Sequence, residues 1–296
     1  LLTRAGFALP VADVETLTVR YAGIGNLLRD LRGMAATNLL PNPPPLTRAT
    51  LWFGPVFVDV GGDLLMDPDR IDRAVTSRTR AILPVHLCGI CADMDAITKI
   101  AKRRRLRVIE DASQAAGARV GGQRAGSFGV AGCFSLHPLK NLNAAGDAGV
   151  VTTNDTALAA KIRLLGNHGL RSRDESVCWG VNSRLDSIQA AIVSTRLGGL
   201  NATIRRRRAI ARRYIQRISR WVTCPRESRR RTHTYHLFVI QCDRRDELAD
   251  FLKSRGIETK IHYPKPIHLQ PCARTLGYSA GDFPVCERLS SRILSL

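Results

Sequence analysis

The segment AILPVHLCGICADMDAITKIAKRRRLRVIED, residues 81–111, has a short β-branched run at each end and a helical pattern between them. Asp93 is a suitable helix cap, and the apolar residues Met94, Ile97 and Ile100 recur at the spacing of one helix face. A strand, a helix and a second strand in this order are typical of a parallel sheet covered by helices. The segment therefore predicts an α/β fold.

The same rhythm continues on both sides of this segment. Asp67 and Pro68 have the residue types of a helix start, and a further helix is expected to begin near Asn154 or Asp155. Together these patterns predict a mostly parallel sheet with helices on both faces. Further strands are predicted for PVFVDV, AGCFSL and AGVVTT at residues 55–60, 131–136 and 148–153.

Three segments are expected along the chain. Residues 1–53 contain a proline cluster and no readable periodicity, so they form an atypical N-terminal segment. Residues 54–200 hold the large α/β domain. Residues 201–296 are expected to form a long helix and a small α+β domain. Within that small domain we predict a strand in TYHLFVIQC, a helix in RDELADFLKSRG and a strand in IETKIHY.

Composition excludes several classes of protein. The chain contains no run of eighteen or more apolar residues, which a membrane-spanning helix would need. Its first residues lack the pattern of a signal peptide. We therefore expect a cytoplasmic protein with no membrane partner. Cys88 and Cys91 form the chain's one CxxC pair, which is too few ligands for a zinc site. We therefore expect buried free thiols and no metal.

The net charge of +20 is concentrated in one region. Residues 201–231 contain twelve arginines and a single acid, Glu227. Ile210, Tyr214 and Ile218 are spaced as the apolar stripe of a helix whose other faces carry arginine. A solvated helix face is favoured over a nucleic-acid groove, because no RNA-binding or zinc-finger motif accompanies it. We expect no specific nucleic acid, and nonspecific binding is left open.

Two segments have residues suited to chemistry. VIEDASQAAGA, residues 108–118, places Asp111 where a strand ends, and ligands of open α/β sheets lie beyond the carboxyl ends of strands. GCFSLHPLKNLNAAGDAGVV, residues 132–151, places Lys140 in a loop between two predicted strands. Taken singly, Asp111 could be an ordinary cap and Lys140 a solvated surface residue.

In this order, the two segments resemble the DegT/DnrJ/EryC1/StrS family over roughly residues 54–296. The resemblance implies a pyridoxal 5'-phosphate-dependent aminotransferase of fold type I. Its expected reaction moves an amino group from an amino acid, with glutamate as the expected donor, to a nucleotide-linked keto-sugar. The product would serve polysaccharide, lipopolysaccharide or antibiotic-sugar biosynthesis. The motifs include PVFVDV, VIEDASQAAGA, GSFGVAGCFSLHPLKN, GDAGVVTTND, NSRLDSIQAAI, HLFVI and IHYPKPIHLQ.

The resemblance assigns cofactor-side roles. Lys140 matches the lysine that forms a Schiff base with the cofactor and moves a proton, and Asp111 matches the carboxylate that pairs with the pyridine nitrogen. Gln114 matches a residue beside the ring, and Ser135 a donor to the cofactor phosphate. Asn182 matches a residue that reaches the neighbouring subunit's cofactor, which implies a homodimer with shared active sites.

Substrate-side roles are less specific. His262 and Tyr263 resemble the family's substrate-side loop, and His86 follows a predicted strand near the same edge. Each residue also has a purely structural interpretation. Ser135 could form a hydrogen bond at the end of a strand, and Asn182 could cap the helix that follows it. A histidine at a strand end is more often a hydrogen-bonded core residue.

The N-terminal region departs from the family pattern. Residues 1–53 show neither the turn that holds the cofactor phosphate nor the aromatic residue that stacks on the ring. The chain ends at Leu296, where relatives continue, so we expect the small domain to be incomplete. A catalytically impaired or regulatory homologue is therefore the main alternative. The family's sugar dehydratases carry histidine in place of the lysine, and Lys140 argues against that branch.

Overall fold

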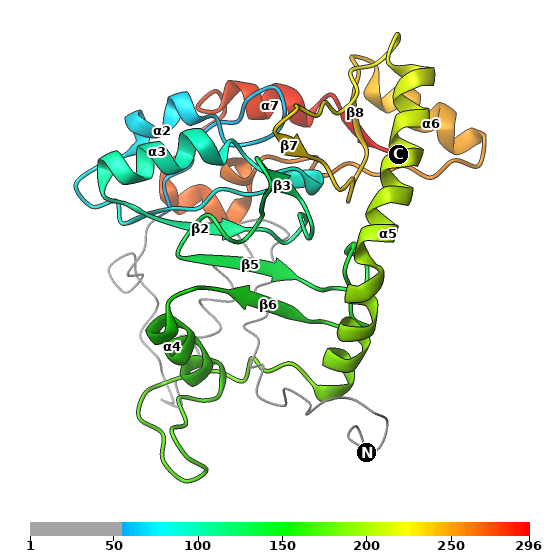
Figure 1. Ribbon diagram of the computed structural model, residues 1–296. Helices are drawn as coiled ribbons and strands as arrows, with labels where there is room; N and C mark the ends of the chain where they lie inside the picture. Colours follow the sequence, from blue (N-terminus) through cyan, green and yellow to red (C-terminus); the bar gives the residue numbers. More distant parts are fainter. Residues whose placement is uncertain (1–54) are drawn as a thin grey trace.

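The computed structural model describes residues 55–296 (Figure 1). The predicted N-terminal segment lies outside the described residues. The helices are α2 (Pro68–Ala74), α3 (Met94–Arg104), α4 (Thr156–Gly166), α5 (Ser187–Ile218), α6 (Arg245–Ser254) and α7 (Pro284–Ser290), with short 3-10 helices η2 (Leu87–Gly89), η3 (Ile267–Leu269) and η4 (Pro271–Leu276). The strands are β1 (Ala81–Ile82), β2 (Arg107–Asp111), β3 (Arg119–Val120), β4 (Gln123–Arg124), β5 (Ala131–Ser135), β6 (Gly149–Thr152), β7 (Arg231–Thr232), β8 (Val239–Gln241) and β9 (Ile293–Ser295).

The central sheet has the strand order β1-β2-β5-β6, and Figure 1 shows β2, β5 and β6 side by side. The pairs β1/β2 and β2/β5 are parallel, and β6 joins β5 antiparallel. Two smaller antiparallel sheets follow, β4-β3-β7 and β8-β9. The predicted α/β fold with a mostly parallel sheet is confirmed.

Helix α3 covers the sheet because its sequence is amphipathic. Its Asp93 cap accepts a hydrogen bond from the Ala96 amide at 3.1 Å, as predicted. Met94, Ile97 and Ile100 are buried in one hydrophobic cluster with residues of the sheet. The strand–helix–strand unit therefore places the carboxyl end of β2, which is Asp111, at a fixed edge of the core.

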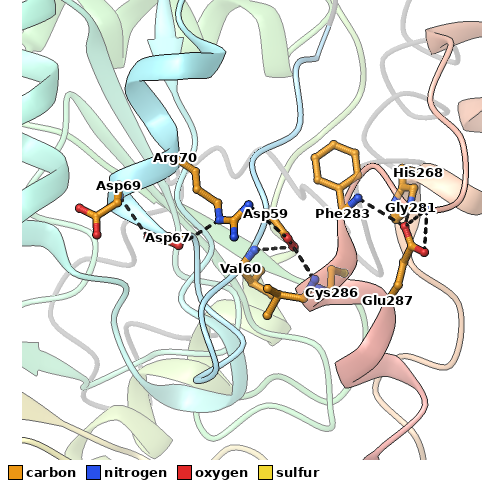
Figure 2. Close-up of polar contacts among 11 residues, drawn as sticks. Asp59, Val60, Asp67, Asp69, Arg70, His268, Gly281, Phe283, Cys286 and Glu287 are labelled. Carbon is orange, nitrogen blue, oxygen red and sulfur yellow. Dashed lines mark hydrogen bonds and ion pairs between the residues drawn. The ribbon is translucent and has the colours of Figure 1, made fainter.

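The predicted strand PVFVDV is wrong, because only Val60 makes a single bridge, to Met66. The buried Asp59 in this segment instead caps α7, a helix far along the chain, through direct hydrogen bonds, as Figure 2 shows. Its carboxylate accepts hydrogen bonds from the amides of Val285 and Cys286 at 3.1 and 3.0 Å. These amides have no partner within their own helix, so the segment serves a helix end and not a sheet.

Replacing Asp59 by alanine is expected to lower the free energy of unfolding by about 2 kcal/mol, because two first-turn amides of α7 lose their acceptor. Chemical denaturation measures this loss. Asp250→Ala, at an exposed position on α6, is the control. Equal stability of the two variants would contradict the assigned cap.

The predicted strand IETKIHY is also wrong, since only Lys260 pairs, in a single bridge to Ser295. The strand that pairs with β8 is β9, near the end of the chain.

Helix α5 runs without a break through residue 200, where we placed a domain boundary. Its N-terminal half packs near the loop after β5, and its C-terminal half packs on β8 and α6. In Figure 1 it runs along one side of the molecule over most of its height. The division at residue 200 stays a prediction, and the helix connects the two parts.

The apolar stripe predicted on α5 is partly wrong. Ile218 is half-buried, but Ile210 and Tyr214 are 43% and 40% exposed. The stripe that faces the core is shifted by one residue and contains Leu200, Ile204, Ala211, Ile215 and Ile218. The neighbouring arginines are mostly exposed, as expected for a solvated face.

Within residues 55–296, no helix has both the length and the apolar character that a bilayer crossing requires.

Cys88 and Cys91 are buried free thiols, which confirms the interpretation of the CxxC pair. Burial raises the pKa of Cys88 to about 12. Burial, with the nearby charge of Glu110, does the same for Cys91. Both thiols are therefore protonated and belong to the core.

Candidate active site

Asp111 and Lys140 lie near each other at the carboxyl edge of the sheet. Asp111 ends β2, and Lys140 lies in the loop between β5 and β6. Burial raises the pKa of the Asp111 carboxyl, and burial lowers the pKa of the Lys140 amine. The positive charge of Lys140 lowers the pKa of Asp111, and the negative charge of Asp111 raises the pKa of Lys140, so each opposes the effect of burial on the other. The two groups are therefore within electrostatic range of each other.

The backbone holds Asp111 firmly in place. Its amide donates to the Pro84 carbonyl at 3.0 Å, and its carbonyl accepts from the His86 amide at 2.9 Å. The Ser113 amide donates to its carboxylate at 3.0 Å. A buried carboxylate held by its neighbour's amide is a suitable partner for a cationic ring nitrogen.

The loop that carries Lys140 is tied down on both sides. The Lys140 amide donates to the His137 carbonyl at 2.8 Å. The Asn141 side chain donates to the Thr234 carbonyl at 3.1 Å, which joins the loop to the segment before β8. Gln189 of α5 accepts a hydrogen bond from the Ala145 amide at 2.9 Å. The lysine is therefore positioned by contacts from three regions of the chain.

Gln114 connects Cys88 with the predicted substrate loop. Its side-chain oxygen accepts from the Cys88 amide at 2.7 Å, and its nitrogen donates to the Tyr263 hydroxyl at 3.4 Å. Burial raises the pKa of Tyr263, so this hydroxyl keeps its proton. The structure thus brings together Gln114 and Tyr263, which sequence reasoning placed on different sides of the site.

His262 lies next to Tyr263 and is hydrogen-bonded through Nδ1 to the Ser295 hydroxyl at 2.8 Å. Burial lowers its pKa, and the charges of Lys260 and Lys140 lower it further. His262 is therefore a neutral ring within electrostatic range of Lys140.

Ser135 and Asn182 lie on other elements. Ser135 ends β5, and its hydroxyl accepts a hydrogen bond from the His137 amide at 3.4 Å. Asn182 is exposed, and its side-chain oxygen accepts from Arg184 at 3.0 Å. Their predicted contacts with the cofactor phosphate, in the same and in the neighbouring subunit, stay predictions.

His86 has no ring nitrogen left for a substrate, which argues against its predicted role. Its Nδ1 accepts from the Ala92 amide at 3.2 Å, so the proton is on Nε2, which donates to Glu110 at 3.0 Å. Both side chains are fully buried. His86 is therefore a hydrogen-bonded core residue, which is the structural interpretation given above for a histidine at a strand end.

Glu110 organises the turn before β5. Besides His86, its carboxylate accepts hydrogen bonds from the amides of Gly126, Phe128 and Gly129 at 2.6–2.8 Å. Burial alone would raise its pKa, but the hydrogen bonds, first that of His86, outweigh burial and leave the pKa below its ordinary value of 4.5. Ionised Glu110 therefore stabilises the fold above that pH.

Glu110→Gln is expected to lower the free energy of unfolding by about 3 kcal/mol near neutral pH, since a fully buried, paired charge is lost. Because the pKa is lowered in the fold, the wild-type advantage is lost as pH falls below about 4.5. Denaturation curves at several pH values measure both effects. A difference that stayed constant into acid would contradict this role.

Two residues beside Lys140 were missed from the sequence. Asn141 anchors the lysine loop, and the ring of His236 lies within electrostatic range of Lys140. His236 belongs to HLFVI, which the sequence indicated only as part of a strand. The feature of the sequence that could have identified His236 as a site residue is that HLFVI is one of the motifs shared with the family.

Comparisons with known proteins agree with this geometry. The model of the DegT/DnrJ/EryC1/StrS aminotransferase family matches residues 49–296. The crystal structure of S. venezuelae DesV in complex with a ketimine intermediate has a TM-score of 0.81 and 37% identity, covering 97% of this chain and 81% of that one.

Two curated relatives match over shorter shares of their length. A pleiotropic regulatory protein of Geobacillus stearothermophilus is 44% identical over 247 residues, which is 82% of this chain and 66% of the relative. A dTDP-3-amino-3,4,6-trideoxy-alpha-D-glucose transaminase of Streptomyces venezuelae is 41% identical, covering 78% of this chain and 62% of the relative. The chain thus spans slightly less than two thirds of these relatives. By its motifs, its fold and these matches, the chain belongs to the DegT/DnrJ/EryC1/StrS aminotransferase family.

Proposed function

We propose that this protein is a pyridoxal-phosphate-dependent aminotransferase that acts on a nucleotide-linked keto-sugar. The observation that carries the proposal is the pairing of a buried carboxylate, Asp111, with a partly buried amine, Lys140, within electrostatic range. Perturbed titratable groups of opposite charge at one sheet edge are characteristic of functional sites. The relatives support the reaction type, since one is a transaminase of a dTDP-linked sugar.

The residues present fit the cofactor. Aminotransferases of this family depend on pyridoxal phosphate. Its aldehyde requires an amine whose pKa is lowered, and its ring nitrogen requires a carboxylate. Lys140 and Asp111 meet these two requirements. Two buried polar atoms near Lys140, Asn141 Oδ1 and His236 Nδ1, lack hydrogen-bond partners within residues 55–296, as expected where a polar group binds.

When bound, the cofactor supplies an electron sink for the carbon that loses a proton. Lys140 would hold the cofactor and then carry that proton between substrate and cofactor carbons. Asp111 would keep the ring nitrogen protonated, and Gln114 would lie beside the ring. Tyr263 and His262 would contact the sugar substrate, because Tyr263 is hydrogen-bonded to Gln114 and His262 lies within electrostatic range of Lys140, and both side chains are uncharged.

The finer assignments belong to the same proposal. Glutamate is the proposed amino donor, the proposed pathways are those of polysaccharide, lipopolysaccharide or antibiotic sugars, and the proposed location is the cytoplasm. A homodimer with shared active sites is supported by large apolar side chains that are exposed in the lysine loop, in the segment between α4 and α5, and at the start of α5. Among them, Leu139 is 75%, Trp179 87% and Ile188 68% exposed.

A regulatory homologue without catalysis is the alternative, and one relative is named as a regulatory protein. Such a protein has no need of a partly buried Lys140 within electrostatic range of Asp111. The retained pair therefore favours the enzyme.

The deciding experiment adds pyridoxal phosphate, reduces any imine with borohydride and maps the modified residue by mass spectrometry. The expected result is a single label on Lys140, with none on the exposed Lys161 of α4. A label absent or on another lysine would refute the proposal. Amino transfer is then measured with glutamate and dTDP- or UDP-linked keto-sugars, and the size of the protein in solution tests the dimer.

A further inference from the structure

The loop that carries Lys140 closes on itself. The Ala144 amide donates to the Leu136 carbonyl at 2.8 Å, so the two ends of the loop lie together. Inside the loop, the side-chain nitrogen of Asn143 donates to the Pro138 carbonyl at 2.5 Å. Lys140 lies in the part of the chain that these two cross-links enclose. Its position therefore depends on what holds the closed loop as a whole.

One face of α5 lies along the C-terminal half of this loop. Gln189, Val193 and Arg196 are spaced four and three residues apart, so they share one side of the helix. Gln189 accepts a hydrogen bond from the Ala145 amide at 2.9 Å. Val193 packs against the hydrophobic cluster that contains Ala144. The loop therefore rests on a surface that one helix provides.

Arg196 makes several contacts with the loop through a single atom. Its Nη1 donates to the Asn143 carbonyl at 3.2 Å, to the Ala144 carbonyl at 3.4 Å, and to Asn143 Oδ1. The charge of the guanidinium strengthens such hydrogen bonds. Because the nitrogen of the Asn143 side chain binds the Pro138 carbonyl, this side chain connects both limbs of the loop to α5.

The same helix also fixes the segment to which the other side of the loop is attached. Asn141, which follows Lys140 directly, donates from its side chain to the Thr234 carbonyl at 3.1 Å. Arg207 of α5 donates to the Tyr235 carbonyl, one residue further along, at 3.0 Å. Helix α5 is unbroken between its two ends. The loop is thus held on both sides by contacts that lead to one rigid element.

We propose that Arg196, acting through Asn143, is a positioning residue that holds the lysine loop on α5 and thereby sets the place of the Lys140 amine. The inference rests on the proposed function, in which this amine reacts with the aldehyde of the cofactor. A displacement of about 1 Å in a reacting group can cost about 10²-fold in rate. Arg196 is exposed, so its contacts with the loop are made outside the hydrophobic core.

The first test measures the pKa of Lys140 in the cofactor-free protein by competitive acetylation at a series of pH values, read by mass spectrometry. Burial lowers this pKa from its ordinary value of 10.5, so the pKa reports how firmly the loop holds the amine in place. Arg196→Ala is expected to raise the pKa toward 10.5, because a loosened loop exposes the amine to water. Arg196→Lys is expected to restore most of the difference, since an ammonium group also donates several hydrogen bonds from one nitrogen.

The second test measures the rate at which pyridoxal phosphate forms an imine with Lys140, trapped by borohydride at successive times. Arg196→Ala and Asn143→Ala are each expected to lower this rate by about 10-fold. The double variant should be little slower than either, because both substitutions remove the same connection. Arg206→Ala, at an exposed position further along α5, is the matched control and should change neither readout.

A pKa of Lys140 that is unchanged or lower in Arg196→Ala would overturn the proposal. Equal trapping rates in wild type and Arg196→Ala would also overturn it, because the arginine would then shape the loop without placing the amine. Should Arg196→Ala fail to fold, Asn143→Ala gives the same comparison. A wild-type protein that traps no cofactor would disprove the proposed function, and the pKa of Lys140 would then decide alone whether Arg196 positions the amine.

Discussion

Lys140→Ala is expected to lower kcat/KM for amino transfer by at least about 10³-fold, because the variant loses both its nucleophilic amine and its proton carrier. Borohydride trapping of pyridoxal phosphate should be lost with it. The lysine is half-buried in a loop anchored to the segment before β8. Steady-state kinetics and mass spectrometry measure the two effects.

Lys161→Ala is the matched control, since Lys161 lies exposed on α4 and should be replaceable without effect. Stability should hardly change in Lys140→Ala, because the lowered pKa of Lys140 shows that burial disfavours its charge. A variant that kept both activity and trapping would place the chemistry on another residue.

Local signals explain which elements the sequence predicted correctly. Asp93 caps its helix as expected, and of the two candidates Asn154 and Asp155 the second is the cap, because each capping hydrogen bond involves residues three positions apart. PVFVDV has the composition of a strand but lies opposite the end of α7, more than two hundred residues away. Whether a β-branched run pairs depends on a partner that no local pattern identifies.

The same distinction applies to the site. Asp111 stood out because it ends a strand at the edge where ligands bind, and Lys140 because it lies in a loop between two predicted strands. Their roles came from the resemblance to the family. His86 also follows a strand, yet its ring is occupied by Glu110, which is 24 residues away. His236 was missed because its neighbours in the sequence are strand residues, while the groups that act on it come from the lysine loop, α5 and the substrate loop.

The electrostatics of the site separate function from stability. Glu110 and Asp111 are adjacent, buried and acidic, yet their pKa values shift in opposite directions. Glu110 has its hydrogen bonds satisfied within the protein, so its charge stabilises the fold. Asp111 has fewer donors, so its charge is disfavoured until a cation binds. The sequence shows two acids, and the contacts show which one is available for a ligand.

Asp111→Asn is therefore expected to lower kcat by about 10²- to 10³-fold, the usual effect of removing one electrostatic contact from a reaction site. Covalent trapping at Lys140 should persist, because the amine remains. The pKa of Lys140 should fall further, since Asp111 at present opposes the effect of burial. Kinetics, trapping and competitive labelling together distinguish this variant from a misfolded one.

The same substitution is expected to raise the free energy of unfolding near neutral pH. The pKa of Asp111 is raised in the fold, so its carboxylate destabilises the folded state as pH rises through that value, and asparagine removes this cost while still accepting from the Ser113 amide. Asp250→Asn, exposed on α6, should change neither activity nor stability. A less active but more stable Asp111→Asn protein is the result expected of a carboxylate retained for its ligand, and a variant that lost stability along with activity would mark Asp111 as a structural acid like Glu110.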